Sequence, residues 1–184
     1  KIGGAIHTPT FFGIEEDYNT SIITFSKDTA RYDDMGYFSP FNYNLITPLK
    51  ASISASTNFN NLLIAAEYEL IDYSTSEYFS SGFENENLTI ANIYQRTENI
   101  KIGAEITITP FVLRSGYSKY GSAFTEKDFS TEKYSYGIGL NNGNYFIDVT
   151  YVLSQGSEEY ILFNDPIPLV NTYHNLLFTL GLRY

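Results

Sequence analysis

The chain of 184 residues has no cysteine, no tryptophan and a single methionine. Without cysteine it can form neither disulfides nor thiolate metal sites. Cations are also scarce, because 11 Lys and Arg stand against 21 Asp and Glu and leave a net charge of −10. Since proteins bind phosphate backbones largely through clustered cations, this balance argues against a nucleic-acid partner.

Long apolar runs are missing as well. No run approaches the roughly 20 residues that a membrane helix needs, which excludes helical spans. A β-barrel stays possible, because apolar and polar residues alternate along barrel strands and give them an average hydropathy. The length fits one domain over residues 1–184. The chain begins with lysine and shows no signal peptide, so we expect a processed protein or a piece of a longer one.

Aromatic residues are abundant, with 17 Tyr and 14 Phe. At the C-terminus, apolar residues occupy every second position from Leu176 to Tyr184, and Thr179, Gly181 and Arg183 stand between them. This period is typical of a strand with one apolar face. A final strand that ends on an aromatic residue resembles the assembly signal of bacterial outer-membrane barrels. An amphipathic strand of a soluble sheet is the alternative.

The same alternation recurs along the chain and predicts roughly nine strands. We expect these strands at residues 2–11, 19–27, 43–59, 62–73, 100–108, 111–118, 134–140, 145–151 and 175–184. A short helix is expected around Leu88–Tyr94, within a polar segment.

The lengths of the connections also alternate. Tight turns are expected at 58–61, 109–110 and 141–144, and long polar loops at 28–42, 74–97, 121–131 and 155–171. Outer-membrane barrels have short periplasmic turns and long external loops, and aromatic residues gather near their strand ends. The sequence therefore predicts an all-β fold, a transmembrane antiparallel β-barrel in the bacterial outer membrane. Its C-terminus would lie on the periplasmic side, and lipid and lipopolysaccharide would surround it.

Seven segments also resemble one known family in their order and spacing. They are IGGAIHTPTFF (2–12), YNLITPLK (43–50), AAEYELIDY (65–73), IGAEI (102–106), LRSGY (113–117), GIGL (137–140) and DVTY (148–151). The family is that of the outer-membrane transporters of fatty acids and other hydrophobic compounds, the FadL/TodX type. The resemblance implies the C-terminal part of a fourteen-stranded barrel, whose plug and first strands would precede residue 1. It also implies passive uptake of long-chain fatty acids or other hydrophobic compounds, without a cofactor.

If the apolar faces meet lipid, the polar faces point inward and carry most of the charges. This inward set is His7, Lys50, Glu67, Glu69, Lys101, Glu105, Arg114, Asp148 and Arg183. Such residues either form structural pairs across strands or line a substrate path. An apolar path also needs apolar inward residues, for which the candidates are Phe11, Phe146, Phe163 and Leu169. The latter two lie in an expected loop and could instead pack against a plug or neighbouring loops.

Other activities find little support in the residues. The only histidines, His7 and His174, are far apart, and no Ser–His pair stands out, so we expect neither a metal site nor an enzyme. The acidic residues at 28–34 and 84–86 lack regular calcium-ligand spacing. Two functions stay open: uptake of a hydrophobic small molecule, and a structural or partner-binding barrel in an assembly with other outer-membrane proteins.

Overall fold

The computed structural model describes the backbone of residues 1–26, 29–162 and 165–182, and it is all-β with antiparallel pairing. An eight-stranded sheet has the order β1-β4-β5-β7-β8-β9-β10-β11, and a three-stranded sheet has the order β2-β3-β6. The strands are β1 (Ile2–His7), β2 (Phe11–Ser26), β3 (Thr29–Ile46), β4 (Lys50–Phe59), β5 (Leu62–Asp72), β6 (Glu77–Tyr78), β7 (Arg96–Ile108), β8 (Phe111–Tyr120), β9 (Thr131–Asn141), β10 (Tyr145–Leu162) and β11 (Asp165–Leu182).

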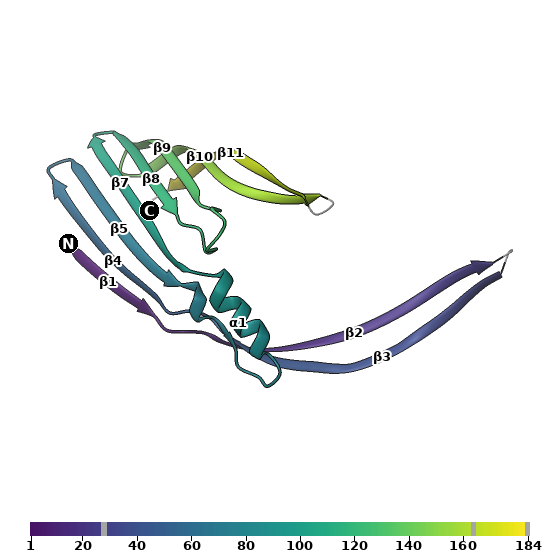
Figure 1. Ribbon diagram of the computed structural model, residues 1–184. Coiled ribbons are helices and arrows are strands. Elements are labelled where there is room, and N and C mark those ends of the chain that lie inside the picture. The colour runs from purple at the N-terminus through teal and green to yellow at the C-terminus, as the bar shows by residue number, and fades with distance from the viewer. Residues whose placement is uncertain (27–28, 163–164, 183–184) are drawn as a thin grey trace.

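The eight-stranded sheet bends into an arch (Figure 1). Its edges are β1 and β11, which pair only with β4 and β10 in the part of the chain that the structure describes. The sheet is therefore open in these residues, with one unpaired edge at each end of the arch.

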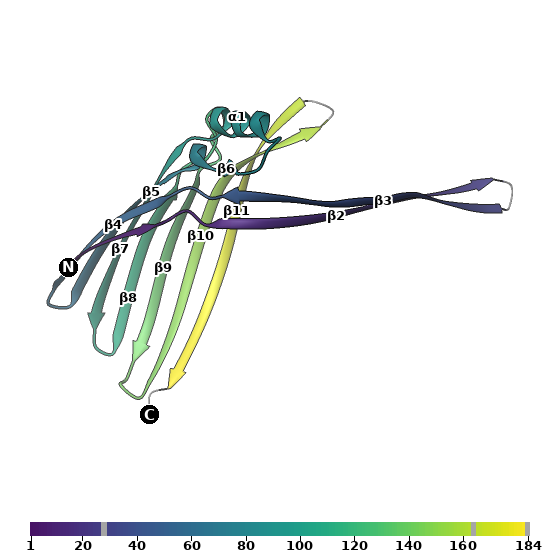
Figure 2. The same ribbon diagram turned by 90° about the horizontal axis from the view of Figure 1, so that it is seen from below.

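The predicted tight turns are confirmed. They join β4 to β5, β7 to β8 and β9 to β10, and all three lie at one end of the strands. Asn60 and Gly143 take positive φ values of 56° and 76° in two of them, a conformation that asparagine and glycine adopt at low cost. Figure 2 shows the helix α1 (Glu84–Ile93) at the opposite end.

The predicted short helix is confirmed as α1, which begins earlier than expected. A 3₁₀ turn (Tyr73–Thr75) and β6 precede it. No helix among the residues placed by the structure is long and apolar enough to cross a membrane.

The prediction of a loop at 28–42 is wrong, because most of these residues belong to β3. The strand pairs with β2 from Phe11 opposite Ile46 to Ser26 opposite Thr29. Its Asp, Gly, Ser and Asn residues suggested a loop, but the hydrogen bonds of a hairpin ladder form between backbones whatever the side chains are. The expected strands 2–11 and 43–59 are each interrupted.

Strands β1 and β2 pair with β4 and β3, and together they form one long hairpin. Both interruptions lie at the same level of this hairpin. His7 stands opposite Lys50 before the break, and Phe11 opposite Ile46 after it, so the register continues and places Pro9 opposite Pro48. Proline has no N–H to donate to a ladder, which explains the gap. The ladder restarts where Thr47 N donates to Thr10 O at 3.0 Å. Figure 1 shows β2 and β3 leaving the sheet here and extending away from it.

The expected loop at 155–171 is also wrong. Strands β10 and β11 stay paired from Tyr145 opposite Leu182 to Leu162 opposite Asp165. Strand β9 accompanies them only as far as Thr131, opposite Gly156. The outer part of this hairpin, which we call the β10–β11 extension (157–162 and 165–170), therefore projects beyond the sheet.

The sheet has no apolar core of the usual kind. Of the hydrophobic side chains that the structure places, only Ile71 and Val112 are buried, with 8% and 5% exposed. Both lie on the face of the sheet that carries the charges, because Ile71 is opposite Lys50 and Val112 is two residues from Arg114.

Candidate functional site: the polar face and the pocket beside the helix

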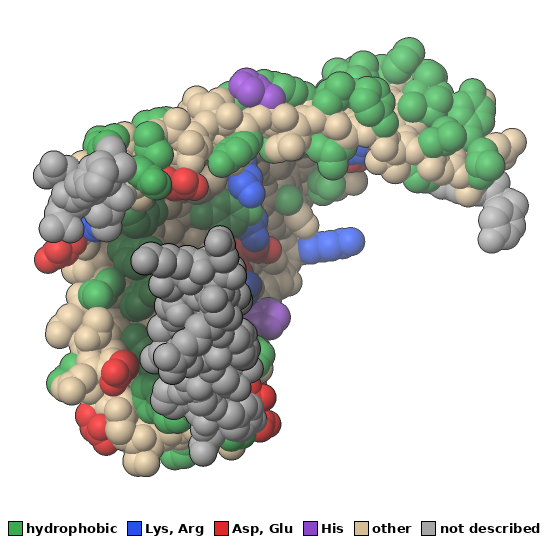
Figure 3. Space-filling view, turned by 90° about the vertical axis from the view of Figure 1, so that its right-hand side faces the viewer, with side chains coloured by type: hydrophobic (Ala, Val, Ile, Leu, Met, Phe, Trp, Pro, Cys, Tyr) green, Lys and Arg blue, Asp and Glu red, His purple; other side chains and the backbone are tan. Residues whose placement is uncertain are grey.

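The two faces of the sheet differ sharply. One, the polar face, carries Lys50, Glu67, Glu69, Lys101, Glu105, Arg114 and Asp148. The other, the apolar face, carries side chains that are between 38% and 85% exposed, among them Ile2, Ile6, Ile53, Ile64, Ile102, Leu113, Ile138, Ile147, Leu176, Phe178 and Leu180. Figure 3 shows hydrophobic side chains along the outside of the arch and charged ones beneath it.

The most buried charged residue of the polar face is Glu69, which is 7% exposed. Lys50 Nζ lies 2.8 Å from its Oε2, and Asn99 Nδ2 donates to its Oε1 at 2.9 Å. Asn99 Oδ1 in turn accepts a hydrogen bond of 3.1 Å from Gly121 N. Both oxygens of the carboxylate are thus occupied, and the network joins β4, β5, β7 and the segment after β8.

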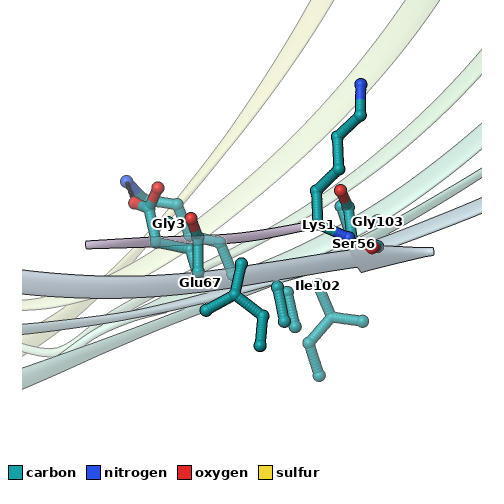
Figure 4. Close-up of a pocket in the computed structure, with 12 residues that line it drawn as sticks. Lys1, Gly3, Ser56, Glu67, Ile102 and Gly103 are labelled. Carbon is teal, nitrogen blue, oxygen red and sulfur yellow. Dashed lines mark hydrogen bonds and ion pairs between the residues drawn. The ribbon is translucent and has the colours of Figure 1, made fainter.

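A second ion pair joins Lys101 Nζ to Glu67 Oε1 at 2.8 Å, between directly opposed residues of β5 and β7. It borders an open pocket of about 540 Å³ near the tight-turn end. Small residues form much of its lining: Gly3, Ser54, Ser56, Ala65 and Gly103. In Figure 4, Lys1 and Glu67 lie on one side of the sheet and Ile102 on the other.

A third group joins charged residues of three strands. Arg114 Nε on β8 lies 2.7 Å from Glu105 Oε2 on β7, and its Nη1 pairs with Asp148 Oδ1 on β10. Strand β9 lies between and contributes Gly137 and Gly139. A Cβ at Gly139 would collide with the Asp148 carboxylate, so the missing side chain makes room for this pair.

Seven of the nine residues that were predicted to face inward therefore form ion pairs or hydrogen bonds with residues of other strands, as is expected of structural pairs. His7 is exposed at the end of β1, and Arg183 lies outside the described residues. The apolar candidates are not brought together. Phe11 is exposed at the start of β2, and Phe146 covers Gly181 near the tight-turn end. Leu169 is exposed on the β10–β11 extension, and Phe163 lies outside the described residues.

A pocket of about 730 Å³, which was not among the expectations from the sequence, lies beside α1; we call it the helix pocket. It is lined by Leu45, Tyr73, Ser76, Tyr78, Asn85, Glu86, Thr89, Ile90, Ile93, Tyr94 and Phe124. One sequence signal pointed to it, because Glu86, Thr89, Ile90 and Ile93 have the spacing of one helical face. Only two of these four residues are apolar, so the pattern was weak.

The walls of the helix pocket are fastened at both ends of α1. Asn87 Nδ2 donates to Tyr78 O at 3.0 Å, and Tyr78 N donates to Asn87 Oδ1 at 2.8 Å. At the other end, Thr125 N donates to Ile93 O at 2.8 Å, and the rings of Tyr94 and Phe124 lie 5.0 Å apart. The pocket is therefore formed by elements that hydrogen bonds hold in place.

An aromatic cluster of Phe41, Tyr43, Tyr78 and Phe83 continues the wall toward the long hairpin, with neighbouring ring centroids 4.7–5.8 Å apart. Tyr43 donates a hydrogen bond of 2.6 Å to Glu16 Oε1. This hydrogen bond favours the neutral phenol and raises the pKa of Tyr43 to about 12. The contact joins β2 to β3 just beyond the paired prolines.

No group of three or more His, Cys, Asp or Glu residues suited to a metal ion occurs in the part of the chain that the structure places. A comparison with known protein families finds no family model that matches the chain, and a comparison with curated proteins finds no match. Function is therefore inferred from the geometry of the chain.

Proposed function

We propose that the eight-stranded sheet is one wall of a transmembrane β-barrel in a bacterial outer membrane. The barrel takes up long-chain fatty acids or other hydrophobic compounds by passive passage. One observation carries the proposal: aliphatic and aromatic side chains cover the exposed face of the sheet, whereas its charged side chains are paired beneath the arch.

The exposed apolar face is costly in water. Full burial of a Val, Leu, Ile or Phe side chain is worth about 1.5–3 kcal/mol, so more than ten such residues left half-exposed forfeit on the order of 10 kcal/mol. That is comparable to the net stability of a whole domain, about 5–15 kcal/mol. Lipid tails would cover this face without any further protein, and the paired charges would face a hydrated lumen.

The unpaired edges of β1 and β11 fit the same proposal only if other strands complete the barrel. In lipid, each unsatisfied backbone N–H or C=O group costs several kcal/mol, so open edges are not tolerated there. We therefore propose that additional strands, from the same chain or another, pair with β1 and β11.

The connections support an orientation. The turns that join β4 to β5, β7 to β8 and β9 to β10 lie at one end of the sheet, and Leu182 of the last strand stands beside Tyr145 at that end. The helix α1, the long β2–β3 hairpin and the β10–β11 extension lie at the other. Short turns are periplasmic in outer-membrane barrels, so the helix pocket would open at the external mouth.

A second function, a barrel that binds a protein partner, is favoured by the β10–β11 extension. Tyr160, Ile167, Leu169 and Val170 are exposed on it, beyond the last residue that β9 covers. Contiguous exposed apolar residues often mark an interaction surface.

Reconstitution of the full chain into lipid vesicles tests the proposal. We expect heat-modifiable migration on a gel, protection of the sheet from protease and entry of a fluorescent fatty acid into the vesicles. A chain that folds as a monomer in detergent-free buffer and does not bind vesicles would overturn the membrane assignment.

The two functions are separated by the double variant Ile167→Ser and Leu169→Ser. A loss of uptake in the folded variant places the β10–β11 extension on the transport route. Unchanged uptake removes it from that route and favours a partner-binding role for the extension itself.

A further inference from the structure

The helix pocket has a charge and ring composition that points to one class of ligand. We propose that it binds an organic ammonium ion with an apolar body. Any consequence of this binding for uptake rests on the function proposed above, whereas the binding of the ammonium ion does not.

Aromatic and aliphatic side chains supply seven of the eleven residues that line the helix pocket. Tyr73, Tyr78, Tyr94 and Phe124 come from four separate segments of the chain, and Leu45, Ile90 and Ile93 add aliphatic surface. Ring faces attract cations electrostatically, and cages of such rings recognise ammonium groups. An apolar body would replace water against the aliphatic part.

The only charged side chain in the lining is the carboxylate of Glu86, and no Lys or Arg lines the pocket among the residues that the structure places. The nearest cations in sequence are engaged elsewhere, because Arg96 pairs with Glu98 at 3.6 Å and Lys127 pairs with Glu159. An anionic ligand would therefore bring its charge beside the Glu86 carboxylate, which has no cationic partner among the described residues, and like charges repel.

The helix pocket thus selects against the carboxylate of a fatty acid. A fatty acid could enter a barrel of this kind only by another route, whereas a cationic amphiphile would find a carboxylate and several rings at the external end. The pocket restricts the proposed hydrophobic cargo to one charge class at this position.

Glu86 also has an ordinary structural explanation, because acidic residues in the first turn stabilise a helix through its dipole. Glu84 lies in the same turn and would have the same effect, but it does not line the helix pocket. It is therefore the matched control for Glu86.

The test uses three probes of one size and different charge: 2-phenylethylammonium, 2-phenylethanol and 3-phenylpropanoate. Their binding to the purified full chain in detergent micelles is measured by titration calorimetry, with empty micelles as the blank. We expect the cation to bind most tightly and the anion most weakly. In Glu86→Gln, the affinity for the cation should fall about two- to fivefold, as for an exposed ion pair, and the affinity for the alcohol should stay the same.

Two further pairs of variants locate the site. Thr89→Trp fills the helix pocket and should abolish binding of all three probes, whereas Ala91→Trp, on the same helix outside the pocket lining, should not. Glu84→Gln should leave the preference for the cation intact.

An anion that binds as tightly as the cation overturns the proposal. So does a cation affinity that survives both Glu86→Gln and Thr89→Trp. Because these measurements need neither membrane insertion nor uptake, their failure leaves the barrel proposal untouched, and failure of vesicle insertion leaves them interpretable.

Discussion

Neighbouring residues of β7 illustrate how different the two faces of the sheet are. Lys101 is half-buried and paired with Glu67, whereas Ile102, the next residue, is half exposed on the apolar face. In a soluble protein we would expect the lysine to be exposed and the isoleucine to be buried. The sheet is therefore held together by its hydrogen-bond ladders and by charges paired across strands rather than by an apolar core, and under the proposed function its exposed apolar side chains would face lipid.

A charge placed on the apolar face should have the largest effect on stability. We expect Ile102→Arg to cost about 2–4 kcal/mol of unfolding free energy in a bilayer, because the cation would face lipid at mid-depth. Thr150→Arg, on the polar face, should cost under about 1 kcal/mol, like most changes outside a packed core. Urea unfolding of both variants in vesicles measures the difference. Equal costs would mean that the two faces are assigned the wrong way round.

Removing the central acceptor of the polar face should have the next largest effect. Glu69→Ala leaves Lys50 and the amide of Asn99 without their partner, so we expect a loss of about 1–3 kcal/mol of unfolding free energy. Ser52→Ala, directly opposite Glu69 on the same face, is the control. A cost no greater than that of the control would show that the ion pairs contribute little to stability.

A smaller effect is expected from the glycines of the polar face. Gly139→Ala should cost about 1 kcal/mol, because the new methyl group displaces the Asp148 carboxylate from Arg114. Gly103→Ala meets its nearest atom, Ser115 O, at 3.7 Å, an ordinary contact, and should be neutral or slightly stabilising. Unfolding curves of the two variants that coincide would contradict the role assigned to Gly139.

The smallest effect is expected outside the sheet. Lys127 pairs with Glu159 and joins the segment after β8 to the β10–β11 extension. Lys127→Ala should lower the unfolding free energy by under about 1 kcal/mol, as for exposed ion pairs. Amide hydrogen exchange at Ser157, which donates to Ser130 O at 3.4 Å, should nevertheless become faster. Unchanged exchange would show that the extension holds its position without this contact.

The alternation of apolar and polar residues and the turn residues were enough to predict the strands of the large sheet and its three tight turns, because period and turn chemistry are local properties. They failed at β3 and at the β10–β11 extension. At both places the hydrogen-bond ladder of a hairpin continues beyond the eight-stranded sheet. The side chains there do not alternate between an apolar and a polar face, so their pattern does not indicate that the backbones are paired. The contact of Arg114 with Asp148 could not be predicted either, since it depends on the register of β9 and on the gap left by Gly139. The helix pocket is assembled from β3, the 3₁₀ turn, β6, α1 and the segment after β8, and no single stretch of sequence contains it.

The paired prolines of the long hairpin have a further consequence. Because Pro9 and Pro48 face each other without donors, an opening of the ladder that starts in the outer hairpin meets a gap before it reaches β1 and β4. A loss of pairing between β2 and β3 would then extend only as far as Thr10 and Thr47. We therefore expect that the outer hairpin can be shortened, lengthened or exchanged for a foreign epitope while β1 and β4 keep their register.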